Sequence, residues 1–300
     1  MPEKTERHGL VAVWLVIASI ASVQIGASVA KQTFGVVTPI GMAWLRLCGA
    51  SAVLGIARAV QTRRARPGPD AEPRPRRNRR AIALYAATMV GMNVSIYEAF
   101  SRMPVGLAVT VEFLGPLTVG ALGASRRRDL AWPVLAFMGV AMLGFTPSRP
   151  ALAGVLFALV AATCWGLYIH AAEEVGHTWT PIDALLVACL AGAVVTTVPA
   201  LVTNDLAVLT PHVLLVGLAV GALSTAIPYS LEIVALRTIP KGAFGILMSL
   251  EPVAAALSAL VLLGEHLHLL DLVAMTCVVV ASIGATRFTW QNRPLDCAPS

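Results

Sequence analysis

The sequence predicts an all-α membrane protein whose ten transmembrane helices form two inverted five-helix repeats. Three observations lead to this prediction: an apolar composition, ten apolar runs along the chain, and a similarity between its two halves. Of the 300 residues, 57% are hydrophobic and 13% are charged, and the mean hydropathy is +0.77. Soluble domains carry about 25% charged residues. The composition therefore excludes a disordered chain and a nucleic-acid-binding chain.

The apolar runs have the length that a bilayer requires. A helix needs about 20 mostly apolar residues to cross ~30 Å of hydrocarbon. The expected spans are residues 9–30, 35–57, 81–101, 105–124, 130–148, 151–172, 182–203, 211–235, 242–264 and 268–287. The first run also has features of a signal peptide, but it exceeds the usual apolar region of about 7 to 15 residues. We expect it to be retained as a helix.

Lysine and arginine residues predict the orientation, because cytoplasmic loops are enriched in them. With the N-terminus in the cytoplasm, 18 of the 22 basic residues fall in cytoplasmic segments, and only Lys31, Arg102 and Arg149 fall outside. Arg46 lies within a span. This bias predicts a multi-pass membrane protein with both termini in the cytoplasm.

The charge clusters also mark the expected domain boundaries. Residues 61–80 form an Arg- and Pro-rich cytoplasmic linker that is too polar to fold alone. It acts either as a topology anchor or as a contact to anionic lipid head groups. We expect a first repeat over residues 1–148, a second, inverted repeat over 149–290, and a polar cytoplasmic tail over 291–300.

A shift of 136 residues aligns the two halves of the chain. The matched pairs are Ala99 with Ala235, Pro104 with Pro240, Gly106 with Gly242, Leu114 with Leu250 and Pro116 with Pro252. Because each half has an odd number of spans, the second half enters the membrane in the opposite sense. Inverted repeats of this kind are typical of secondary transporters with a binding site near the bilayer midplane.

Two of the matched residues interrupt their spans. Pro116 and Pro252 each lie about twelve residues into a span, where proline removes a backbone donor from the helix. Matching interruptions in the two halves of a transporter point to the binding site. The alternative is a tolerated kink in a packed helix.

Ionisable residues inside the spans are candidates for chemistry, because they are costly in a bilayer. They are Arg46, Glu98, Glu112, Glu232 and Glu251. One arginine cannot pair with four carboxylates, so the others must reach water or be protonated part of the time. We expect them to couple transport to protons or to bind a substrate amine. Glu112 and Glu251 are deepest, whereas Glu98 and Glu232 lie near helix ends.

Polar and aromatic residues in the same spans complete the candidate site. Arg46 either binds a substrate carboxylate or pairs with Glu98 or Glu112. The expected cavity lining is Gln24, Asn93, Tyr97, Trp165, Tyr168, His170 and Tyr229. These side chains offer hydrogen bonds and cation-attracting ring faces to a small zwitterion. We expect the cavity to lie among the first, third, fourth, sixth, eighth and ninth spans.

Other chemical motifs are not supported. Glu265, His266, His268 and Asp271 include metal-capable groups, but they lack the helical i, i+4 spacing of a zinc site. The five cysteines form no paired motif and are expected to be packing residues. The chain has no Walker A or Gly-x-Ser-x-Gly motif. We therefore expect neither a cofactor, nor a metal, nor a catalytic site.

Several segments resemble a known family. Pro104-x-Gly106, Pro240-x-Gly242 and a Leu-Gly-Glu segment ending at Glu265 are similar to the EamA family of the drug/metabolite transporter superfamily. Residues 111–117, 228–232 and 248–252 resemble its threonine/homoserine exporter branch. The resemblance covers residues 9–287 and implies proton-driven efflux of small amino acids across the bacterial inner membrane.

The expected function is thus a proton-coupled amino-acid exporter, with a small amino acid, protons and membrane lipid as partners and no nucleic acid. A drug or metabolite exporter with a looser pocket is an alternative of the same class. An integral membrane enzyme or a non-transporting membrane protein is the alternative of another class. The sequence leaves the oligomeric state open.

Overall fold

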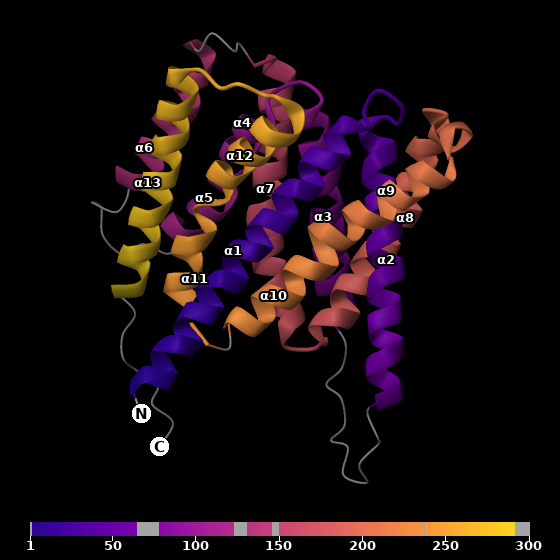
Figure 1. The fold of residues 1–300 in the computed structure, drawn as a ribbon, viewed down its shortest axis with the longest axis horizontal. Coiled ribbons are helices and arrows are strands. Elements are labelled where there is room, and N and C mark those ends of the chain that lie inside the picture. Colours follow the sequence, from indigo (N-terminus) through magenta and orange to yellow (C-terminus); the bar gives the residue numbers. More distant parts are fainter. Residues whose placement is uncertain are drawn as a thin grey trace.

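The computed structural model describes residues 2–64, 78–122, 131–145, 150–236, 238–239 and 241–291. Every regular element in these ranges is helical (Figure 1). Residues 65–77 of the expected linker and residues 292–300 of the expected tail, 291–300, lie outside the described residues.

The helices follow the expected apolar runs. Their bounds are α1 Pro2–Gln32, α2 Pro39–Arg64, α3 Arg79–Phe100, α4 Val105–Glu112, α5 Leu114–Leu122, α6 Ala131–Met142, η2 Leu143–Phe145, α7 Leu152–Gly176, α8 Pro181–Val202, η3 Asp205–Val208, α9 Pro211–Gly221, η4 Ala222–Ala226, α10 Ile227–Leu236, α11 Lys241–Met248, α12 Glu251–Leu263 and α13 Leu269–Gln291. The short elements η2 and η3 are 3-10 helices, and η4 is a π-helix.

Six helical stretches of the described residues are long and apolar enough to cross a membrane. They are Leu10–Gln32, Pro39–Arg63, Leu152–Gly176, Pro181–Val202, Pro211–Leu236 and Ala243–Leu263. Shorter apolar helices cover Val105–Val119, Ala131–Phe145 and Leu269–Ala285. Large apolar side chains such as Phe137 and Val202 are 70% and 81% exposed, which suits a surface in contact with lipid. The chain is an all-helical, multi-pass membrane protein in the part described.

Local sequence explains where several helices begin and end. The α8 and α9 helices each start with proline, which lacks the N–H that a first helical turn leaves unpaired. Thr180 and Thr210 precede them and cap them by accepting from Asp183 N and Val213 N. The α12 helix ends at Gly264, whose φ of 67° favours glycine.

Helices from distant parts of the chain lie side by side. The α3 helix packs along α7, and α1 packs along α10 and α12. The α2 helix contacts α8 and α9, α4 contacts α12, and α6 contacts α13. In Figure 1, α6 and α13 form one edge of the bundle, α2, α8 and α9 form the other, and α1 crosses obliquely between them.

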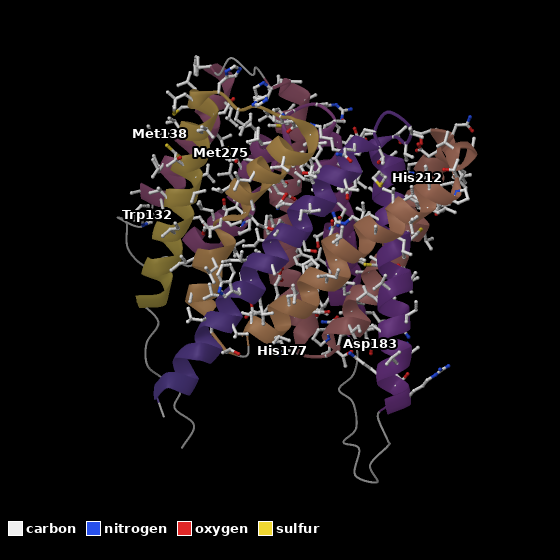
Figure 2. All side chains as sticks on the ribbon, in the orientation of Figure 1. Trp132, Met138, His177, Asp183, His212 and Met275 are labelled. Carbon is white, nitrogen blue, oxygen red and sulfur yellow. The ribbon has the colours of Figure 1, made fainter. Side chains whose placement is uncertain are left out.

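Charged and polar residues lie at both ends of the bundle. The start of α1 and the end of α13 lie at the same end of the molecule (Figure 1). Figure 2 shows His177 and Asp183 at that end and His212 at the opposite end. Asp183 forms an ion pair with Arg58, which joins α8 to α2. These groups bracket the apolar middle of the bundle.

Candidate functional site

A cavity of about 220 Å³ lies inside the bundle. It brings together nine of the residues expected at the site from the sequence: Gln24, Arg46, Asn93, Glu112, Trp165, Tyr168, Tyr229, Glu232 and Glu251. They come from α1, α2, α3, α4, α7, α10 and α12. The α8 helix also contributes, through Leu185 and Cys189. The second and seventh expected spans therefore line the cavity in addition to the six spans that the sequence predicted.

One face of α3 forms a long wall of the cavity. Met89, Met92, Asn93, Ile96 and Phe100 line it. Their spacing of three and four residues places them on one side of an α-helix. The wall is mostly apolar, with one amide. Asn93 Nδ2 donates to the Met89 carbonyl at 2.8 Å, which orients the side chain within the wall.

The two deepest carboxylates lie at breaks in their helices. Glu112 is the last residue of α4, and Glu251 is the first residue of α12. They are 8% and 6% exposed. Glu251 lies in the first helical turn, where the helix dipole favours a negative charge. The breaks thus deliver two acidic side chains to the interior of an apolar bundle.

The two breaks lie 136 residues apart, at residues 113 and 249. Phe113 separates α4 from α5, and Ser249 begins the turn that separates α11 from α12. Pro116 and Pro252 each follow three residues later, where they remove the donors for the carbonyls of residues 112 and 248. Neither proline lines the cavity. They shape the helices that carry Glu112 and Glu251.

Three carboxylates share the cavity. Glu251 interacts electrostatically with Glu112 and Glu232. Glu232 accepts a hydrogen bond from Ser19 Oγ at 2.6 Å, whereas Glu251 Oε2 has no partner among the described residues. Like charges in one site of low dielectric repel each other strongly. A cation or a proton would relieve this repulsion.

Arg46 is the only arginine or lysine that lines the cavity among the described residues. Its Nη2 donates to the Ser224 carbonyl at 3.1 Å, and its Cζ lies 5.7 Å from the centroid of the Tyr97 ring. Arg46 and Glu112 interact electrostatically, but no described carboxylate lies within 4 Å of the guanidinium. The guanidinium therefore remains available to an anion.

Besides the two prolines, three expected site residues lie outside the cavity. Glu98 pairs with Arg102 one turn away, which excludes the expected alternative of an Arg46–Glu98 ion pair in this structure. His170 is exposed, with Nδ1 3.1 Å from the Gly166 carbonyl. Tyr97 is only 1% exposed and lies behind Arg46. These side chains do not face the same space as Glu112.

The structure adds residues that the sequence did not single out. Tyr85 is stacked on Tyr168, with ring centroids 4.7 Å apart and hydroxyl oxygens 2.8 Å apart. Ser19 binds Glu232, and Ser224 binds Arg46 through its carbonyl. Tyr85 lies one helical turn before Met89 on the cavity face of α3, so helical periodicity alone could have identified it.

Several buried polar atoms around the cavity have no hydrogen-bond partner among the described residues. They are Gln24 Oε1, Arg46 Nε, Asn93 Oδ1, Ser224 Oγ and Glu251 Oε2. Buried polar atoms in folded proteins are almost always paired. The set includes both donors and acceptors, so it suits a small molecule that carries groups of both kinds.

Two of the metal-capable residues near the end of α12, Glu265 and Asp271, have structural partners. Glu265 Oε1 lies 2.6 Å from Lys31 Nζ, and Asp271 accepts from His268 N at 2.9 Å. These bonds join α12 to α1 and hold the start of α13.

Comparison with known proteins agrees with the architecture. Residues 152–287 match the model of the EamA-like transporter family. The threonine/homoserine exporter RhtA of Escherichia coli strain K12 is 35% identical over 282 residues, which cover 91% of this chain and 92% of that protein. The exporter of the same name from Salmonella typhimurium strain LT2 is 34% identical over 294 residues, covering 95% of each chain.

The fold also has a counterpart among solved structures. One protein crystal structure superposes with a TM-score of 0.62 at 20% sequence identity, over 93% of this chain and 98% of the other. This likeness concerns the fold alone. The relatives that match at higher identity are named as transporters and not as enzymes. Since they match over nearly their whole length, the chain belongs to the EamA-like transporter family.

Proposed function

We propose that this protein exports small amino acids across the bacterial inner membrane by alternating access, coupled to protons. The observation that carries the proposal is the internal cavity that Arg46 shares with Glu112, Glu232 and Glu251. Buried ionisable groups of both signs suit a substrate that carries both charges. The names of the RhtA relatives support threonine and homoserine as cargo.

The size of the cavity favours a small substrate. Sites for drug-sized molecules usually have volumes of ~300–1,000 Å³, whereas this cavity has a volume of about 220 Å³. A zwitterion of threonine size has few heavy atoms and needs at least one partner for each charge. The cavity therefore supports an amino-acid exporter better than an exporter of bulky drugs.

Proton coupling follows from the balance of charge. With all groups ionised, the cavity holds three carboxylates and one guanidinium. An empty carrier lowers the repulsion by binding a proton, and a substrate ammonium group replaces that proton when it binds. Glu112 and Glu251 are the central residues of this exchange, because both lie at helix breaks and face the same space.

The arrangement of helices supports two inverted repeats with ten spans. If residues 1–148 and 149–290 are equivalent, α1 corresponds to α7 and α3 corresponds to the helix through α9 and α10. The contacts of α3 with α7 and of α1 with α10 are then an equivalent pair, and both occur. The breaks at residues 113 and 249 are separated by the same 136 residues as the sequence repeat. The shared end for the start of α1 and the end of α13 supports two cytoplasmic termini (Figure 1).

Transport by purified protein in liposomes tests the proposal. We expect an imposed pH gradient to drive labelled threonine across the membrane in exchange for protons. Glu112→Gln and Glu251→Gln should abolish the dependence of transport on that gradient. Glu174→Gln is a matched control, because Glu174 is exposed on α7. Unchanged pH dependence in both cavity variants would remove proton coupling from the proposal.

A substrate panel separates the remaining alternatives. Transport of a lipophilic cation but of no amino acid would indicate a drug exporter. If the protein is correctly folded and inserted and transports none of the solutes, the result would favour a membrane protein without transport activity.

A further inference from the structure

The helix from Pro211 to Leu236 changes from α to π geometry at η4. In an α-helix the carbonyl of Ser224 would accept from the N–H of residue 228. That residue is Pro228, which has no N–H. Arg46 Nη2 instead donates to this carbonyl at 3.1 Å. The proline thus makes a backbone acceptor available to an arginine from another helix.

Close packing presses α1 and α2 against η4. A Cβ atom on Gly26 of α1 would lie 2.2 Å from Ser224 Oγ, and a Cβ on Gly221 would lie 2.7 Å from the Arg46 carbonyl. Only glycine permits contacts this short. Ser224 is consequently 7% exposed, although it lines the cavity.

The atoms at this junction are donors that lack acceptors. Ser224 Oγ and Arg46 Nε are buried without a partner among the described residues. A guanidinium carries five N–H donors. Among the described residues, Arg46 donates to the Ser224 carbonyl and interacts with Tyr97, while its Nε has no partner. Helices with π geometry are frequent at functional sites. Two neutral acceptors, Gln24 Oε1 and Asn93 Oδ1, and the carboxylates of Glu112 and Glu251 face the same cavity.

We propose that Arg46 and Ser224 form the carboxylate subsite for an α-amino acid, with Pro228 as the residue that positions Arg46. This inference rests on the proposed transport function and specifies its substrate class. The guanidinium N–H groups and the Ser224 hydroxyl donate to the substrate carboxylate. The substrate ammonium then faces the acidic residues of α4 and α12. A molecule without a free carboxylate lacks the group that this subsite recognises.

The test compares threonine with threoninol, in which a CH2OH group replaces the carboxylate. Both compete with labelled threonine for purified protein in lipid nanodiscs. We expect the unmodified protein to bind threoninol at least about 10-fold more weakly, since a hydrogen bond to a charged group has an effect of this size. In Ser224→Ala, threonine affinity should fall about 10-fold while threoninol affinity stays unchanged.

Two further variants make the test specific. Pro228→Ala supplies an N–H that competes with Arg46 for the Ser224 carbonyl. It should therefore also lower the affinity for threonine without lowering the affinity for threoninol. Arg46→Lys keeps the charge but loses the planar set of donors. It should therefore also reduce the preference for threonine over threoninol. Ser230→Ala is the matched control, because Ser230 Oγ bonds the Ala226 carbonyl and does not line the cavity.

The possible outcomes separate this inference from the function on which it rests. Equal binding of threonine and threoninol by the unmodified protein would overturn the carboxylate subsite and leave an amino-acid carrier intact. Equal losses of affinity for both ligands in Ser224→Ala and Pro228→Ala would also overturn it. Such losses indicate general structural damage, which leaves the ratio of the two affinities unchanged. Binding of no standard amino acid by folded protein would overturn the proposed function and the subsite together.

Discussion

The hydroxyl oxygens of Tyr85 and Tyr168 lie 2.8 Å apart, and their rings stack with centroids 4.7 Å apart. This pair joins α3 to α7 beside the cavity. Tyr85→Phe keeps the stacked ring but removes one hydroxyl. We expect the free energy of unfolding to fall by about 1 kcal/mol, measured by denaturation in detergent. Tyr85→Leu should cost more, because it also removes the stack. Equal stability of both variants and the unmodified protein would contradict this role.

Glu265 is expected to stabilise the end of the bundle opposite the start of α1. Its Oε1 lies 2.6 Å from Lys31 Nζ, and its Oε2 accepts from Val105 N at 2.9 Å. Glu265→Ala leaves both donors without this partner, so unfolding free energy should fall by about 1–3 kcal/mol. A double-mutant cycle with Lys31→Ala measures the coupling of the two residues. Strictly additive losses would show that they do not interact.

Pro252 is expected to place Glu251 by interrupting the helix before it. Pro252→Ala restores the N–H that pairs with the Met248 carbonyl, so α11 can continue into α12 and rotate Glu251. Threonine transport should fall several-fold while expression and stability are kept, and liposome transport per folded protein measures this. Pro199→Ala is the control, because Pro199 lies inside α8 away from the cavity. Similar effects of both variants would contradict a local role for Pro252.

Asp205 is expected to hold the start of α2, the helix that carries Arg46. It is 3% exposed and accepts from Thr38 N at 2.8 Å, from Thr38 Oγ1 at 2.6 Å and from Thr203 Oγ1. Asp205→Ala removes all three bonds and should lower unfolding free energy by about 1–3 kcal/mol. Thermal denaturation measures the loss, and Asp205→Asn should show a smaller one. An Asp205→Ala variant as stable as the unmodified protein would contradict this assignment.

Much of the fold follows from apolar length alone, because a bilayer requires long runs of apolar residues. The sequence predicted interruptions in the fourth and ninth of those runs, but it did not predict the residues at which the helices break. The fourth expected span divides into α4 and α5, and the ninth into α11 and α12. Pro116 and Pro252 marked the right turns, but each break lies three residues before its proline, since a missing donor acts on carbonyls of the preceding turn.

The candidate site residues were predicted from their polarity and their position within a span, and helical periodicity would have excluded two of them. His170 lies two residues after Tyr168, and Glu98 lies two residues after Ile96. A separation of two places side chains on nearly opposite faces of an α-helix. Both residues accordingly lie outside the cavity. The role of Ser224 was not accessible from one helix, because it depends on how closely α1, α2 and η4 approach one another.

The chain has four tyrosines, and all of them lie in or beside the cavity. Tyr168 and Tyr229 line it, Tyr85 is stacked on Tyr168, and Tyr97 lies against Arg46. Biosynthetic incorporation of fluorotyrosine would therefore give a fluorine NMR spectrum with four resonances, all from this region. Such a spectrum would report occupancy and opening without background from the rest of the bundle.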